Sequence, residues 1–179
     1  MEDRRTIKTK RAIRNTFISL LREKPLNKIT VSEISEKADL GRGTFYLHYK
    51  DVYDLYEQME DKLYMGLGEI VDASYAKNEH MDIKVLSQTI LEYVSANKEA
   101  FQLFTFSENY GKLLHKLRVL FCEKIFEYRK EKHISLQERI DIIFLVSGIT
   151  GIIEEWLADD IDISQEQLAL RLHDILVKF

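Results

Sequence analysis

The chain has 179 residues, 45% of them hydrophobic and 31% charged, so it can bury a core and does not have the composition of a disordered protein. Seven glycines and one proline leave few turn formers, which disfavours a many-stranded sandwich or barrel and favours long helices. The single cysteine, Cys122, excludes an internal disulfide framework and a tetrahedral thiolate zinc site. We expect a reducing cytoplasm and, because the first residues have no apolar run, no secretory signal.

Charge is divided unevenly along the chain. Residues 1–50 hold 12 Lys or Arg against 6 Asp or Glu, a net charge of +6. Residues 51–179 hold 14 against 24, a net charge of −10, and the two sum to the −4 of the whole chain. This pattern predicts two domains, 1–50 and 51–179, of which the first binds an anion. The alternative is a chance cluster of basic residues on a solvated face.

Apolar periodicity and helix-capping signals predict an all-α chain. The first helix is expected over residues 4–24, because Ile13, Phe17 and Leu20 recur at helical spacing and Pro25 ends it. Eight further helices are expected, at residues 31–38, 42–48, 52–76, 82–96, 98–105, 108–131, 136–159 and 165–178.

Three of these helices begin with a capping box, in which a Ser or Thr and the Glu or Gln three residues later each bond the other's backbone N–H. The pairs are Thr30 with Glu33, Ser135 with Glu138, and Ser164 with Gln167. A turn that contains glycine joins the first two short helices, which makes residues 31–48 a helix-turn-helix candidate.

The second short helix begins with residues that suit a DNA recognition helix. Arg42 can reach guanine O6 and N7 bidentately, Gly43 lets the backbone approach closely, and Thr44 can contact a base edge or a phosphate. Phe45 and Tyr49 lie four residues apart and are expected to form the core under this helix. The alternative for Arg42 is a solvated charge without a role in recognition.

Four more residues are expected to contact phosphates, which position a protein on DNA without reading its sequence. Tyr46, His48 and Lys50 follow at alternating positions and have polar tips. Thr30 begins a helix, where the helix dipole and free N–H groups favour a phosphate. His48 could instead be a capping or core residue.

This segment resembles the DNA-binding domain of the TetR/AcrR family of bacterial transcriptional regulators. The resemblance covers roughly residues 8–56 and rests on Thr30-Val31, Ile34, Ala38, Leu40, Gly43-Thr44-Phe45-Tyr46, His48-Tyr49 and Leu55. The chain departs from the pattern at Asp39, Gly41 and Val52, where glycine, a capping serine and a phosphate-contacting lysine are usual. A palindromic double-stranded DNA operator, bound by a homodimer, is therefore the expected partner.

Residues 142–153 carry no charge and are too few to span a membrane, which needs about 20 apolar residues. A helix that is apolar on all sides is buried on all sides, so a second copy is expected to cover one face. The helices at 136–159 and 165–178 would form a four-helix bundle through Ser147, Gly148, Gly151, Ile152, Leu168, Leu172 and Ile175. The alternative is a central core helix of a monomer.

The C-terminal region also resembles a TetR subgroup that includes regulators of dihydroxyacetone kinase operons (DhaS-like). This resemblance rests on the segments FLVSG and GITGIIEEWLADDIDISQEQLA. It implies dimerisation through the last two long helices and a pocket for a small-molecule effector. Buried O–H and N–H groups need partners that a ligand could supply, so the expected ligand-binding residues are Tyr93, Tyr110, His115 and Trp156.

No catalytic or metal-binding motif is present in the sequence. None of the five histidines has a histidine four residues away or a glutamate three residues before it, and neither G-x-S-x-G nor a P-loop occurs. We therefore predict a regulator that is not an enzyme, with no metal, cofactor or membrane partner. It would be a repressor that an effector releases from DNA. The alternatives are an activator whose C-terminal domain docks a protein partner, and a helical ligand-binding bundle without a DNA role.

Overall fold

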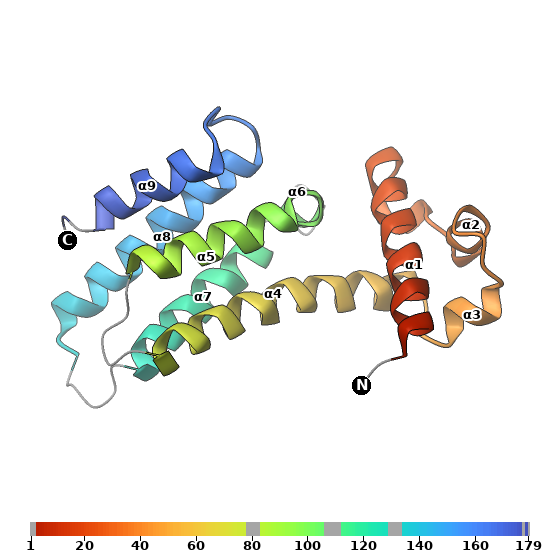
Figure 1. Ribbon diagram of the computed structural model, residues 1–179, viewed down its shortest axis with the longest axis horizontal. Helices are drawn as coiled ribbons and strands as arrows, with labels where there is room; N and C mark the ends of the chain where they lie inside the picture. The colour runs from red at the N-terminus through yellow and green to blue at the C-terminus, as the bar shows by residue number, and fades with distance from the viewer. Residues whose placement is uncertain (1–2, 78–82, 106–111, 129–133, 177, 179) are drawn as a thin grey trace. The chain divides into compact units, whose positions relative to one another are not determined.

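The computed structural model describes residues 3–77, 83–105, 112–128, 134–176 and 178, none of which lies in a strand. The elements in chain order (Figure 1) are α1 (Arg4–Glu23), the 3-10 turn η1 (Leu26–Lys28), α2 (Val31–Lys37), α3 (Arg42–Tyr46), α4 (Val52–Lys77), α5 (Ile83–Ala96), α6 (Lys98–Thr105), α7 (Lys112–Tyr128), α8 (Leu136–Leu157) and α9 (Gln165–Leu176). The all-α prediction is confirmed.

Two compact units divide the chain, Met1–Lys62 and Leu63–Phe179. The division falls inside α4, so the first turns of that helix belong to the N-terminal unit. The domain boundary expected at residue 50 lies just before α4 begins.

A small hydrophobic core holds the N-terminal unit together. Ile13, Phe17 and Leu20 lie on one side of α1 and are fully buried, as are Ile34 of α2 and Phe45 of α3. Full burial of one such side chain contributes about 1.5–3 kcal/mol. The first three helices therefore pack together through these five buried residues.

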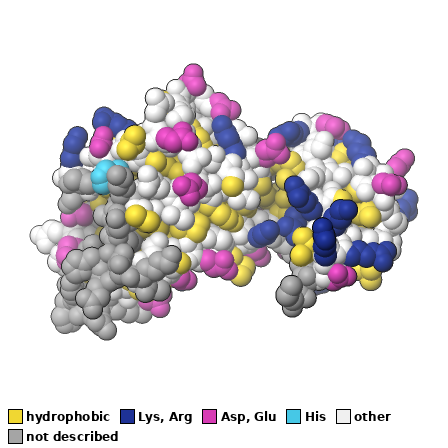
Figure 2. All heavy atoms as spheres, in the orientation of Figure 1, with side chains coloured by type: hydrophobic (Ala, Val, Ile, Leu, Met, Phe, Trp, Pro, Cys, Tyr) yellow, Lys and Arg dark blue, Asp and Glu magenta, His cyan; other side chains and the backbone are white. Residues whose placement is uncertain are grey.

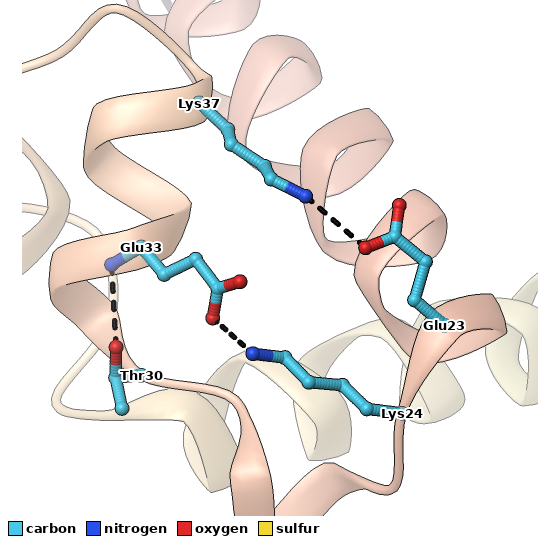
Figure 3. Close-up of polar contacts among 5 residues, drawn as sticks. All are labelled: Glu23, Lys24, Thr30, Glu33 and Lys37. Atoms are coloured by element: carbon cyan, nitrogen blue, oxygen red, sulfur yellow. Dashed lines mark hydrogen bonds and ion pairs between the residues drawn. The ribbon is translucent and has the colours of Figure 1, made fainter.

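Two ion pairs tie the end of α1 to α2 (Figure 3). Lys24 Nζ lies 2.5 Å from Glu33 Oε2, and Lys37 Nζ lies 3.2 Å from Glu23 Oε2. The Thr30 side chain accepts a hydrogen bond from the backbone N–H of Glu33, as the capping box requires. The second half of that box was predicted wrongly, because the Glu33 carboxylate pairs with Lys24 instead of returning to Thr30.

The turn between α2 and α3 contains two of the departures from the TetR pattern. Asp39 has φ = +54°, a left-handed conformation in which glycine is less strained. Gly41 is the N-cap of α3 and provides no side chain to cap it. Each substitution removes a small local stabilisation that the usual residue would provide.

In the C-terminal unit, α5 packs on α9, α7 packs on α8, and α6 contacts α5, α7 and α8. At Gly66 of α4, an added Cβ would lie within 2.9 Å of three atoms of the Tyr93 side chain, so glycine permits close contact with α5. Both predicted boxes at the last two helices form. Ser135 pairs reciprocally with Glu138, and Ser164 with Gln167.

A polar cluster joins α4 to α7 within the same unit. Lys124 Nζ donates to both carboxylate oxygens of Asp72, at 2.6 and 2.8 Å, and the Tyr128 hydroxyl donates to Asp72 at 2.9 Å. The Lys124 hydrogen bonds lower the pKa of Asp72. Tyr128 also stacks on Tyr75 with ring centroids 3.9 Å apart.

Candidate functional site

The exposed side of α3 is set by what lies beneath it. Phe45 is fully buried and Tyr49 is 3% exposed, with their ring centroids 5.5 Å apart. The expectation that these two aromatic residues form the core is confirmed. Because they turn inward, Arg42, Gly43 and Tyr46 are left on the solvent side of the helix.

Arg42 begins α3 and is exposed, and its guanidinium donates a hydrogen bond to the Ser32 hydroxyl of α2. This contact places the Arg42 side chain next to α2. A Cβ added at Gly43 would meet nothing within 4 Å, so the backbone there is open to approach. Thr44 is half-buried.

The expected phosphate contacts differ in exposure. Tyr46 and Lys50 are exposed, His48 is half-buried and packs its ring edge against Tyr49, and Thr30 is exposed at the start of α2. The Lys50 backbone N–H donates to the Asp54 carboxylate at 2.7 Å, which lowers the pKa of Asp54. The backbone at Lys50 is therefore fixed while its side chain faces solvent.

An exposed leucine beside these residues was missed by sequence reasoning. Leu47 follows α3 directly, between Tyr46 and His48, and is 78% exposed. The sequence pattern considered only polar side chains at alternating positions, and Leu47 is apolar. An apolar side chain at the end of a recognition helix can contact the methyl group of thymine.

The helix α1 of the same unit is rich in exposed basic residues. The helix α1 contains seven Lys or Arg residues and one acidic residue, Glu23. Arg4, Arg5, Lys8 and Arg11 are exposed. Figure 2 shows Lys and Arg side chains gathered over α1 on the face of the N-terminal unit turned to the viewer. Such a surface attracts a polyanion, and its attraction weakens with salt.

A second exposed surface runs along α8. Four large apolar side chains, Leu136, Ile140, Ile143 and Phe144, are 73%, 57%, 40% and 65% exposed. Their spacing continues through the predicted interface residues Ser147, Gly148 and Gly151, which makes one helical face that we call the α8 stripe. A Cβ added at either glycine would meet nothing within 4 Å.

Two residues expected at the dimer interface are instead buried within the core of a single chain. Leu168 and Leu172 are each 1% exposed, because α9 packs on α5. Ile152 and Ile175 are half-buried, and Leu170 is the exposed apolar residue of α9. The four apolar residues at the start of the α8 stripe were missed, although their i, i+4, i+7 and i+8 spacing is readable in the sequence.

The C-terminal unit contains a cavity of about 170 Å³, lined by 14 residues of α5, α7, α8 and α9. Leu91, Ile142, Val146 and Leu172 are its buried lining residues of apolar type. Of the expected ligand-binding residues, none that the structure describes lines it.

Their actual contacts explain this outcome. Tyr93 packs over Gly66, and Trp156 is buried with its indole N–H donating to the Ile163 carbonyl at 3.0 Å. His115 is exposed, with Nδ1 lying 3.2 Å from the Arg118 guanidinium. Tyr110 lies outside the described residues. The Trp156 N–H that we expected a ligand to satisfy is thus satisfied by the chain itself.

Two other kinds of feature are absent from the described ranges. There, no three His, Cys, Asp or Glu side chains gather in a metal-binding arrangement. No helix in the same part of the chain is long and apolar enough to cross a membrane. Burial raises the pKa of the Cys122 thiol, which keeps it protonated and weakly reactive.

Comparison with known proteins assigns the family. A TetR-type family model, described as a transcriptional regulator C-terminal region, matches residues 82–178. The chain belongs to the TetR family of transcriptional regulators. A curated relative, the uncharacterized HTH-type transcriptional regulator YxbF of Bacillus subtilis, is 23% identical over 166 residues. That match covers 92% of this chain and 43% of YxbF, so the chain spans less than half the length of this relative.

Solved structures share the fold over nearly the whole TetR-family chain. The dihydroxyacetone kinase operon activator DhaS matches with a TM-score of 0.66 at 18% identity, covering 95% of this chain and 94% of its own. NalD of Pseudomonas aeruginosa, the secondary repressor of the MexAB-OprM multidrug efflux pump, matches with a TM-score of 0.66 at 17% identity. This match covers 98% of the present chain and 97% of NalD. The fatty acid degradation regulator FadR of Bacillus halodurans matches at 0.60 and 20%, covering 94% of each chain.

Proposed function

We propose that this TetR-family chain is a sequence-specific DNA-binding repressor that acts as a homodimer and is released by a small-molecule effector. One observation carries the DNA-binding part. The N-terminal residues of α3 are held outward by the buried Phe45 and Tyr49, so that Arg42 and Gly43 are offered to solvent together. An α-helix presented in this way fits the major groove, and arginine reads guanine there.

Phosphate contacts would set the position of this helix on the duplex. Lys50 follows α3, Thr30 begins α2, and the exposed basic residues of α1 add attraction from the same unit. Contacts of this kind dominate affinity but are insensitive to sequence. We therefore assign base reading to Arg42, Gly43 and Thr44, and positioning to Thr30, Tyr46, His48 and Lys50.

The α8 stripe supports the homodimer. Leu136, Ile140, Ile143 and Phe144 form a contiguous apolar row on one helix face, of a kind that marks protein interfaces. Gly148 and Gly151 continue the row and have open space at Cβ, which lets a second helix approach closely. A two-fold dimer would present two copies of α3 to a palindrome.

Release by an effector is supported by the cavity in the C-terminal unit. The helix α4 is continuous from Val52 to Lys77 and belongs to both units, so a change at one end can bias the other. A ligand shifts such an equilibrium only by its differential affinity for the two states. DhaS, which shares the fold, is an operon activator, and this favours a second candidate function, a regulator that recruits a protein partner to DNA.

DNA selection tests this proposal. The full chain is incubated with a pool of random duplexes, and bound DNA is amplified, sequenced and measured by fluorescence anisotropy at several salt concentrations. We expect enrichment of a two-fold symmetric sequence and an affinity that falls steeply as salt rises. Binding without enrichment of any sequence, or no binding at low salt, would overturn it. The same sequence placed in a promoter then separates repression from activation.

The matched control for this test is Arg171→Ala. Arg171 is exposed on α9 in the other unit, and its substitution removes the same charge as a substitution in α3. We expect its selected sequence and its affinity to equal those of the unchanged chain.

A further inference from the structure

The chemistry of the cavity lining restricts what can occupy it. All lining residues are apolar except Ser87 of α5 and Thr150 of α8, and none of them is charged. Ser87 is 9% exposed and Thr150 is half-buried. A charged ligand group placed here would lose its hydration without gaining an ionic partner from the wall, which is strongly unfavourable.

The volume restricts the occupant further. A cavity of about 170 Å³ is close to the roughly 150 Å³ of an engineered Leu, Ile and Phe-lined cavity in another protein, which stays dry and binds benzene. One six-membered aromatic ring with a small substituent therefore fills this space. The cavity is not fully enclosed, and its lining residues Leu86 and Ile90 are half-buried.

Thr150 gives the cavity a defined hydrogen-bonding preference. Its hydroxyl donates to the Val146 carbonyl at 2.9 Å and lies 3.1 Å from the Ser147 carbonyl. The single hydroxyl hydrogen is therefore used within α8, while an oxygen lone pair remains able to accept. A ligand that bonds Thr150 must bring a donor, such as an O–H group.

An acidic residue one helical turn from Thr150 also disfavours an anionic ligand. Glu154 lies one helical turn beyond Thr150 on α8 and is half-buried. Burial, with the nearby Glu155, raises the pKa of Glu154. When ionised, the Glu154 carboxylate would repel an anionic ligand group close to this turn.

We propose that the cavity binds a small, uncharged aromatic molecule, with Thr150 accepting a hydrogen bond from a hydroxyl group of that molecule. The inference rests on the proposed function only for its consequence, which is release of DNA. Binding itself is measured without DNA, so the two ideas can fail separately.

The experiment uses the full chain and three probes of equal ring size: toluene, phenol and benzoate. Isothermal titration and ligand-observed NMR should detect toluene and phenol, and benzoate should bind at least about 10-fold more weakly than phenol. Equal binding of benzoate and phenol would overturn the proposal. Failure of all three probes to bind would also overturn the proposal. That result is expected if a second copy of the chain fills the cavity.

Two variants locate the binding. Thr150→Val should raise the Kd of phenol about 3- to 10-fold and leave that of toluene unchanged, because only phenol loses a hydrogen bond. Ile90→Phe should fill the cavity and weaken both probes more than about 10-fold. Ile70→Phe is the matched control, since Ile70 is also half-buried in this unit but does not line the cavity.

Thermal unfolding monitors whether each variant folds, and the control must bind phenol like the unchanged chain. If Thr150→Val changed the affinities for phenol and toluene equally, or Ile90→Phe left both intact, the assignment to this cavity would be wrong. If the probes bound as expected but the chain did not bind DNA, the ligand assignment for the cavity would be retained and the proposed DNA-binding function would be rejected.

Discussion

The two units of this chain use their residues in opposite ways. In the N-terminal unit a few aromatic and aliphatic side chains fill a small core, and the residues proposed to act on DNA are exposed or half-buried and mostly polar. In the C-terminal unit the features proposed to act are apolar: a cavity between four helices and a stripe of exposed side chains on α8. The first unit is therefore proposed to bind a charged partner, and the second is proposed to bind partners without charge.

This comparison predicts that charge placed on the α8 stripe has the largest effect. Phe144→Glu should dissociate the dimer, because Phe144 is 65% exposed in one chain and the charge would be buried only at the interface. Sedimentation at micromolar concentration and circular dichroism measure assembly and folding. DNA affinity should fall with the dimer, since both recognition helices are needed.

Met65→Glu is the matched control for that variant. Met65 is 60% exposed on α4 and lies off the stripe, so this substitution should leave the dimer intact. A monomeric unchanged chain, or a Phe144→Glu dimer as tight as the unchanged one, would contradict the proposed interface.

The next largest effect is expected from a substitution that disturbs the packing between α4 and α5. Gly66→Ala should cost about 1–3 kcal/mol of unfolding free energy, because the new methyl group overlaps the Tyr93 ring. Gly68→Ala should be neutral or stabilise by about 0.5–1 kcal/mol, since its nearest neighbours are Leu120 atoms at 3.8 Å and alanine favours helix. Chemical denaturation measures both, and equal effects would show that this close approach is unimportant.

The smallest expected effect compares the two positive-φ aspartates. Asp39→Gly should stabilise the N-terminal unit by about 0.5–1 kcal/mol, because φ = +54° strains a side chain. Asp159, with φ = +62°, also accepts hydrogen bonds from Lys98 at 2.7 Å and Gln102 at 3.3 Å. Asp159→Gly should therefore gain less. A larger gain at Asp159 than at Asp39 would contradict this explanation.

The sequence predicted the helices well because their signals are local. Ser135 and Ser164 mark the starts of α8 and α9, and the capping boxes that they predict are present in the structure. The exposed side of α3 was also predictable, because Phe45 and Tyr49 are four residues apart and must share the buried face. A helix that begins with a cap and repeats its apolar residues needs no knowledge of distant neighbours.

Features that depend on distant packing were not predictable in the same way. Leu168 and Leu172 look like any apolar stripe in the sequence, and only the packing of α5 on α9 shows that they are internal. The cavity requires side chains from four helices to leave a space between them. Trp156 has a satisfied N–H only because the chain returns at Ile163 after α8 ends.

The central claim is that α3 reads bases while nearby charges position it, and one pair of variants tests it directly. Arg42→Ala and Lys50→Ala each remove one exposed positive charge, from α3 and from the residues that follow it. Anisotropy titrations would measure each variant on the selected duplex and on random duplex over a range of salt. Arg42→Ala should cost about 1–3 kcal/mol on the selected duplex and lower its preference over random DNA. Lys50→Ala should weaken both duplexes alike and flatten the salt slope by about one unit. An Arg42→Ala chain with an unchanged ratio of selected to random affinity would contradict the claim.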